Sequence, residues 1–245
     1  MQSIYAYETL TEGKQMQVEV ERIIPCLEAY IAYLRKNYQL NELPQAIVWT
    51  SKNIATKVLS NVPIPAYTNN QRIVVTPNID EWRQFWREIL PKDVPSYMQA
   101  YFRDWEMVHV IQIIGHEITH HLDEFVGDFL EEEKEEIWFE EGMVEYLSRE
   151  YFLTLQQFQE VVRIETDLVY YFEGKYGVSS IEDFERKTYE AQELIEVFYY
   201  YWKSFLKVYE LVDKAGSPKV VFDIYHQWLQ ERTDKSLLEW FDMQL

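Results

Sequence analysis

Most of the chain carries a helical pattern, and this feature constrains its fold more than any other. From Asn78 onward, apolar residues recur at helical spacing. Only 7 of the 245 residues are glycine and 16% are aromatic, which favours helices over a turn-rich β architecture. We expect helices over 79–90, 96–124, 133–150, 154–175, 188–214 and 217–231, and a short closing helix near 235–243.

The N-terminal part has a mixed pattern. Residues 14–38 predict a helix that Pro25 divides or kinks. Residues 46–50 (AIVWT) predict a short strand, and a helix over 51–59 follows. Two β-prone pieces flank Asn69-Asn70, which indicates a hairpin.

These patterns predict an α+β fold that is mainly α. A small mixed-sheet lobe over 1–125 precedes a helical lobe over 126–245, and the two form one domain overall. The sequence does not indicate an oligomeric state.

Charge and cysteine content exclude several classes of protein. The chain has 23 Lys+Arg and 42 Asp+Glu, so 23 − 42 gives a formal charge of −19, which disfavours nucleic acid and anionic membranes as partners. A single cysteine, Cys26, excludes an internal disulfide framework and a Cys-rich zinc site, and we expect it in the core. No secretory signal or membrane-length apolar run is visible, so we expect a cytoplasmic protein.

The sequence His116-Glu117-Ile118-Thr119-His120 lies in an apolar stretch without proline. Residues four apart on a helix share a face, so His116 and His120 can bind one metal ion. Glu117 points about 100° away around the helix and can act as a general base. A chance match on a solvated helix is the plain alternative, but the apolar flank VHVIQIIG favours a buried position.

Two histidines leave a zinc site one ligand short. Glu124 lies four residues after His120 on the same predicted helix, where it is poorly placed around the ion. Glu141 lies 21 residues after His120, which leaves room for a loop and a second helix. We therefore favour Glu141 as the third ligand.

The segment Trp138-Phe139-Glu140-Glu141-Gly142 resembles the second motif of the gluzincin metallopeptidases, the thermolysin-like and aminopeptidase-like group. The resemblance implies a zincin-like fold with the active-site cleft between the lobes, and Zn²⁺ held by His116, His120 and Glu141. It further implies peptide-bond hydrolysis of a peptide or protein substrate, with Glu117 as the general base. Glu145 corresponds to the acidic residue that orients a zinc-binding histidine. Glu140 departs from the usual asparagine of the family.

A later segment extends the resemblance. Tyr201-Trp202-Lys203-Ser204-Phe205 resembles the aminopeptidase helix that brings a tyrosine hydroxyl to the oxyanion, which makes Tyr201 a candidate catalytic residue. Tyr199 and Tyr200 are rivals, and core packing is the alternative for all three. Residues 71–76 could form the edge strand that binds substrate backbone. The amine-binding motif of the aminopeptidases is absent, so endopeptidase and exopeptidase action are not separated.

Other polar residues have simpler interpretations. His109 lies two turns before His116, too far away to share the ion, and is expected in the core or at the surface. We expect His121 to be exposed or to have a local hydrogen-bond partner. Asp123 could orient His120, although a surface acid is the commoner case. The acidic run 131–136 predicts a solvated helix start.

Two other classes of protein remain open. Carboxylate-bridged di-iron bundles use Glu-x-x-His pairs, and Glu117–His120 is one such pair. The second pair would be Asp223–His226, with aspartate in place of glutamate. Alternatively, the chain could be a non-catalytic peptide-binding protein on a peptidase scaffold.

Overall fold

The computed structural model describes residues 1–60, 63–125, 136–231 and 233–245. It is mainly helical with one small mixed sheet, which confirms the expected α+β class. The described part of the chain forms two compact units. One comprises residues 1–130 and 148–158, and the other comprises 131–147 and 159–245.

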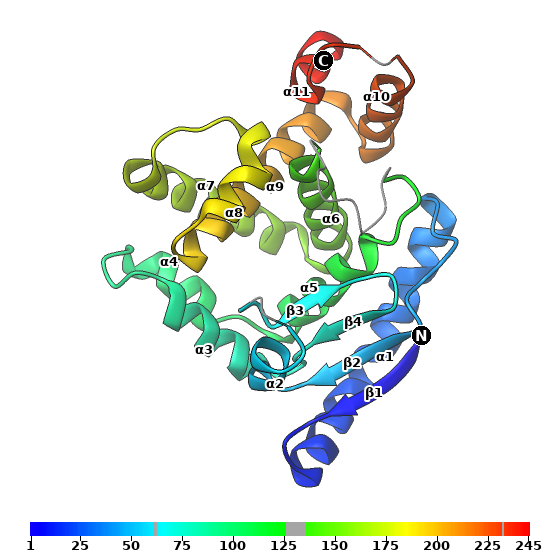
Figure 1. Ribbon diagram of the computed structural model, residues 1–245, viewed down its shortest axis with the longest axis vertical. Helices are drawn as coiled ribbons and strands as arrows, with labels where there is room; N and C mark the ends of the chain where they lie inside the picture. Colours follow the sequence, from blue (N-terminus) through cyan, green and yellow to red (C-terminus); the bar gives the residue numbers. More distant parts are fainter. Residues whose placement is uncertain (61–62, 126–135, 232) are drawn as a thin grey trace. The chain divides into compact units, whose positions relative to one another are not determined.

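The first unit is built on a four-stranded sheet of order β1-β2-β4-β3 (Figure 1). Strands β1 (Gln2–Ala6), β2 (Ala46–Thr50) and β4 (Arg72–Val75) are parallel, and β3 (Ala66–Thr68) is antiparallel to β4. The predicted strand over 46–50 and the predicted hairpin are confirmed. Asn69 stabilises the hairpin turn, since its side-chain oxygen accepts hydrogen bonds from the backbone N–H of Gln71 and Arg72.

The prediction that 71–76 is an edge strand is wrong. Strand β4 pairs with β2 on one side and with β3 on the other, so β3 is the edge. The residues Ile73, Val74 and Val75 are all fully buried. A continuous apolar run of this kind is typical of a strand covered on both faces.

The rest of the first unit is mostly helical. It contains α1 (Leu10–Asn37), α2 (Lys52–Lys57), α3 (Ile79–Ile89), α4 (Ser96–Arg103) and α5 (Met107–Thr119). Helix α1 continues through Pro25, so the proline does not divide it. It buries Val20, Ile23, Leu27, Tyr30 and Leu34 at helical spacing. Helix α5 packs against α1 and against the β3–β4 side of the sheet.

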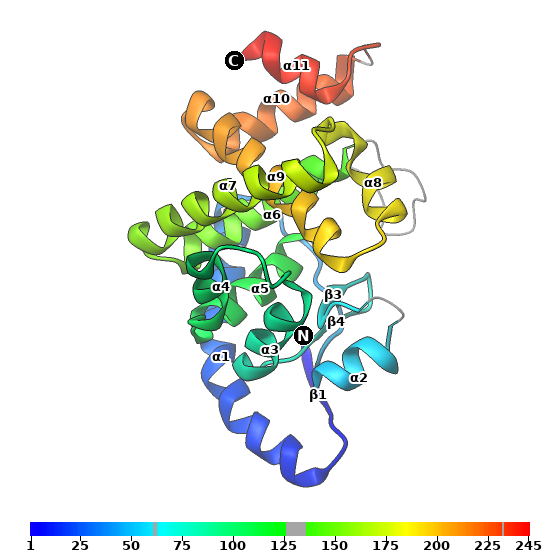
Figure 2. The same ribbon diagram turned by 90° about the vertical axis from the view of Figure 1, so that its left-hand side faces the viewer.

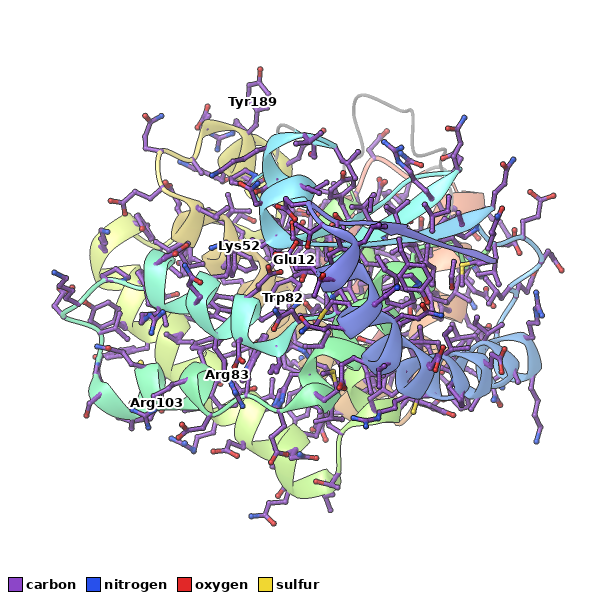
Figure 3. All side chains as sticks on the ribbon, turned by 90° about the horizontal axis from the view of Figure 1, so that it is seen from below. Glu12, Lys52, Trp82, Arg83, Arg103 and Tyr189 are labelled. Atoms are coloured by element: carbon purple, nitrogen blue, oxygen red, sulfur yellow. The ribbon has the colours of Figure 1, made fainter. Side chains whose placement is uncertain are left out.

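The expected helix over 96–124 is two helices, α4 and α5. The reciprocal cap between Glu106 and His109 starts α5 locally. From outside the segment, the Arg83 guanidinium donates to the carbonyl oxygen of Trp105 at 3.0 Å. Arg83 lies on α3 beside Trp82, whose indole N–H donates to the carbonyl of Thr76 (Figure 3). No proline or glycine marks the break in the sequence.

The second unit is helical. Helix α6 (Ile137–Phe152) and α7 (Leu155–Tyr176) each have residues in both units, and the predicted acidic helix start lies mostly outside the described residues. The 3₁₀ turn η1 (Ile181–Asp183) precedes α8 (Phe184–Glu190), α9 (Leu194–Ala215), α10 (Pro218–Glu231) and α11 (Leu237–Gln244) (Figure 2). Phe139 packs against Tyr225, Phe241 and Phe222, with ring centroids 4.7, 5.6 and 6.1 Å away. No described helix is both long enough and apolar enough to cross a membrane.

Candidate metal centre

Helix α5 carries His116 and ends at the motif. Val110, Ile114 and Ile118 are fully buried, which confirms the buried setting that the apolar flank predicted. The helix stops at Thr119, so His120 is its C-cap and not an interior residue. The backbone N–H of His120 still donates to the carbonyl of His116 at 3.3 Å, which keeps the two histidines one turn apart.

The two imidazole rings converge. Their Nε2 atoms lie 3.1 Å apart, and the ring planes are inclined by 76° with centroids 4.8 Å apart. Two nitrogens bound to one tetrahedral zinc ion at about 2.0–2.1 Å are separated by about 3.3 Å. The spacing of the Nε2 atoms is therefore the one that a shared ion requires.

A buried hydrogen-bond chain ties this part of α5 to α1. The Thr119 hydroxyl donates to the carbonyl of Gly115 at 2.7 Å, and the Tyr30 hydroxyl lies 2.7 Å from the Thr119 oxygen. Because Thr119 gives its one hydrogen to a carbonyl, Tyr30 must be the donor to Thr119. Burial raises the pKa of Tyr30 far above its ordinary value, so this donor stays protonated.

The residues after His120 are also tied down. His121 Nε2 lies 2.7 Å from the hydroxyl oxygen of Thr68 on β3, so its partner is distant in sequence and not local as expected. The Asp123 carboxylate accepts from the backbone N–H of Asn41 at 2.9 Å. Asp123 therefore anchors the segment that follows α1.

Glu124 has a similar structural role. Its carboxylate accepts a hydrogen bond from the backbone N–H of Gln39 at 3.2 Å, also in the segment after α1. His109 is buried at the start of α5, where its Nδ1 accepts from the backbone N–H of Glu106 at 3.0 Å. Cys26 is exposed, so its expected place in the core is wrong.

Helix α6 carries Glu141 two turns before residues that contact α5. Gln112 donates to the Ser148 hydroxyl at 3.0 Å, and both side chains are buried. A Cβ atom added at Gly115 would lie 2.5 Å from the Phe152 ring. Glycine at 115, directly before His116, therefore lets the end of α6 approach α5 closely.

A second glycine follows Glu141. A Cβ atom at Gly142 would lie 2.5 Å from both the backbone oxygen of Ser204 and a methyl group of Val208 on α9. Only glycine permits this approach of α6 to the α9 backbone. In the sequence, Gly142 interrupts a helical pattern, and a glycine in such a place often indicates close contact with a neighbouring backbone.

The close approach of α9 places one of the three tyrosines beside Glu141. The Tyr201 hydroxyl donates to the Glu141 carboxylate at 3.1 Å. Tyr199 donates instead to the carbonyl of Gly177, and the Tyr200 hydroxyl accepts from Ser179. Tyr199 and Tyr200 are fully buried, whereas Tyr201 is only partly buried.

His116, His120 and Glu141 form a group in which one ligand atom of each lies within 4.8 Å of the others. His116 and Glu141 are each 8% exposed, and His120 is partly buried. Two imidazoles and a carboxylate at this spacing form a donor set that can hold a metal ion. Its burial argues against a chance cluster of surface acids, because buried groups of this kind need partners.

Two further carboxylates flank the group in sequence. Glu117 follows His116 on α5 and is 7% exposed. Glu145 lies one turn after Glu141 on α6 and is partly buried. Asp223, which the di-iron alternative would need as a ligand, is exposed on α10. The group around His116 does not include Asp223 or His226.

Comparisons with known proteins identify no relative: no family model, no curated protein and no solved structure matches the chain.

Proposed function

We propose that the chain is a zinc-dependent peptidase of the gluzincin type, with its catalytic centre at His116, His120 and Glu141. The observation that carries the proposal is the convergence of these three ligand atoms within 4.8 Å. The donor set is the two-His, one-Glu combination of zinc peptidases. Three protein ligands leave the fourth coordination position of a tetrahedral zinc ion open. The substrate would be a peptide or protein, bound beside the three ligand residues.

Zinc suits this donor set. Imidazole nitrogens and one carboxylate are common zinc ligands, and the 3.1 Å between the Nε2 atoms fits a single ion. When bound, zinc supplies Lewis acidity that polarises the scissile carbonyl and lowers the pKa of an attacking water. Iron in a two-metal bundle would need further carboxylates, and the exposure of Asp223 gives that alternative no support.

The chain's own residues would move the protons. Glu117, next to His116 and buried, would accept a proton from the attacking water and pass it to the leaving amine. The Tyr201 hydroxyl, which donates its one hydrogen to Glu141 in this structure, would turn from Glu141 and donate it to the oxyanion as charge develops. Glu145 would orient a ligand histidine, as the resemblance implies.

Hydrolysis of a mixed peptide library, followed by mass spectrometry, tests the proposal. Wild-type protein loaded with zinc should cleave peptides, and Glu117→Gln should retain zinc but lose about 10²- to 10⁴-fold in rate, because only the general base is removed. Glu160→Gln, at an exposed position on α7, is the matched control and should keep full activity. Undiminished cleavage by Glu117→Gln, or no cleavage by zinc-loaded wild type, would contradict the proposal.

A further inference from the structure

Strand β1 is an edge strand that is exposed on both faces. β1 is the first strand in the order of the sheet. Its side chains on both faces are exposed, namely those of Gln2, Ser3, Ile4 and Tyr5. Ile4 is 43% and Tyr5 37% exposed, and Met1 just before the strand is 44% exposed. Among the described residues, no strand pairs with the outer side of β1.

The strand lacks the devices that normally protect such an edge. Natural edges carry charged side chains, proline or a bulge, because open edges pair with other chains. Residues 1–7 (MQSIYAY) contain no charged side chain and no proline in a chain of net charge −19. The pairing of β1 with β2 runs from Gln2 to Ala6 without a bulge.

The direction of the backbone groups fixes which residues can pair outward. The N–H of Gln2 donates to the carbonyl of Gln45 at 2.8 Å, toward β2. Backbone groups alternate along a strand, so those of Ile4 and Ala6 also face β2. The N–H and C=O groups of Ser3 and Tyr5 therefore point to the open side.

We propose that β1 is a homodimer interface, in which it pairs antiparallel with β1 of a second copy about a two-fold axis. In the register that uses all outward groups, Ser3 of each copy forms a doubly hydrogen-bonded pair with Tyr5 of the other. Ile4 then lies opposite Ile4 of the second copy at the axis, about 4.5 Å apart between Cα atoms. The two four-stranded sheets join into one continuous sheet.

A second copy fits this edge because the contact is self-complementary. Every side chain opposed in this register, from Met1 to Tyr7, is uncharged, so no like-charged side chains face each other across the two-fold axis. Isoleucine opposite isoleucine at the close, non-hydrogen-bonded position buries apolar surface that is exposed in the single chain.

The start of α1 provides an independent argument. Residues 10–19 include no buried residue, and this part of α1 extends beyond β1 (Figures 1 and 2). Leu10 at its start is 86% exposed. The same register places Tyr7 of one copy opposite Met1 of the other, which brings the start of one α1 to the partner's Met1.

Met1 lines a groove that can receive this segment. The groove lies along α1. Its lining combines the apolar Met1, Ile31, Ala32 and Leu43 with the charged Glu28, Arg35 and Lys36. The exposed Leu10 of one copy would thus meet apolar side chains of the other. Strand pairing and helix contact follow from one symmetry operation, which is why we choose a second copy over an unrelated peptide.

Sedimentation equilibrium over a concentration series tests the dimer with the full-length chain. Wild-type protein should approach twice 29.7 kDa. Ile4→Lys and Ile4→Glu should each shift the mass to that of the single chain, because like charges would meet at the axis. A mixture of the two variants should regain the dimer mass. Val178→Lys, at an exposed site in the second unit, is the control and should stay dimeric.

The mixed variants make the register itself testable. Wild-type protein that stays monomeric, Ile4→Lys protein that stays dimeric, or a Lys–Glu mixture that stays monomeric would each overturn the proposal. Tyr5→Pro removes an outward N–H without removing a bond to β2, and it should also give monomers. Far-ultraviolet circular dichroism checks that the variants are folded. The dimer does not depend on the proposed peptidase activity.

Discussion

Gly115 and Gly142 each lie beside a proposed zinc ligand, and each allows a contact that any side chain would block. At Gly142 the obstacle to a Cβ atom is the backbone oxygen of Ser204, which cannot rotate away. At Gly115 the obstacle is the Phe152 ring in a buried setting. The close packing around the candidate centre therefore requires that both positions lack a side chain.

Gly142→Ala should lower the free energy of unfolding by about 1–3 kcal/mol, because overpacking forces α6 and α9 apart. Chemical denaturation measures this change. Gly174→Ala is the matched control, since Gly174 lies in α7 with no atom near its added Cβ. It should be neutral or stabilise by up to about 1 kcal/mol. Equal effects of the two substitutions would mean that α6 and α9 are not in close contact at Gly142.

Tyr201→Phe should separate a catalytic role from a structural one. Loss of an oxyanion donor lowers kcat by about 10²- to 10³-fold with little change in zinc affinity. Tyr199→Phe removes a hydroxyl from the same helix that donates to the carbonyl of Gly177 and not to Glu141. This control variant should keep the wild-type kcat. A Tyr201→Phe variant with normal kcat and weaker zinc binding would show that Tyr201 only orients Glu141.

Sequence alone could predict some residues of the site and not others. The pair His116 and His120 follows from a short motif, because a helix fixes the geometry of residues four apart. Glu141 could be predicted from its spacing after His120 and from the resemblance of 138–142 to a family motif. The choice among Tyr199, Tyr200 and Tyr201 could not be made, since neighbouring residues on one helix point in different directions. The partners Gly177, Ser179 and Glu141 that distinguish them come from other elements.

At the scale of elements, long periodic helices and the buried strand β2 could be predicted, and two features could not. Strand β1 carries no buried face, so it shows no apolar alternation. The break between α4 and α5 is stabilised in part by Arg83, which is distant in sequence. A local pattern cannot reveal a boundary that a tertiary contact stabilises.

The start of α5 should make stability depend on pH. Burial lowers the pKa of His109 below its ordinary value near 6.5, and in the folded chain the neutral ring accepts a hydrogen bond from Glu106. The unfolded chain therefore takes up the proton first as pH falls. This stabilising contribution is complete above about pH 6.5 and is lost as pH falls below that value.

Denaturation of wild type and His109→Gln between pH 5 and 8 tests this linkage. The free energy of unfolding of wild type should fall more steeply below about pH 6.5 than that of the variant, by at most about 1.4 kcal/mol per pH unit. Parallel curves for the two proteins would mean that His109 does not titrate differently on folding.

At the scale of the whole molecule, composition constrained the class of protein more than its activity. A charge of −19 and a single cysteine argue against nucleic-acid partners and a Cys-rich zinc site, whereas the metal site is predicted from the motif at His116 to His120. The architecture is the expected mainly helical α+β fold. The central claim is that His116, His120 and Glu141 act together on one ion.

Metal content by elemental mass spectrometry on purified protein, after zinc is offered and excess is removed, tests this claim most directly. We predict about one zinc per chain for wild type and for the control His226→Ala, with most zinc lost in Glu141→Ala and His120→Ala. Wild-type protein that binds no zinc, or a Glu141→Ala variant that retains it fully, would contradict the three-ligand site. Two irons per chain would instead indicate a carboxylate-bridged centre.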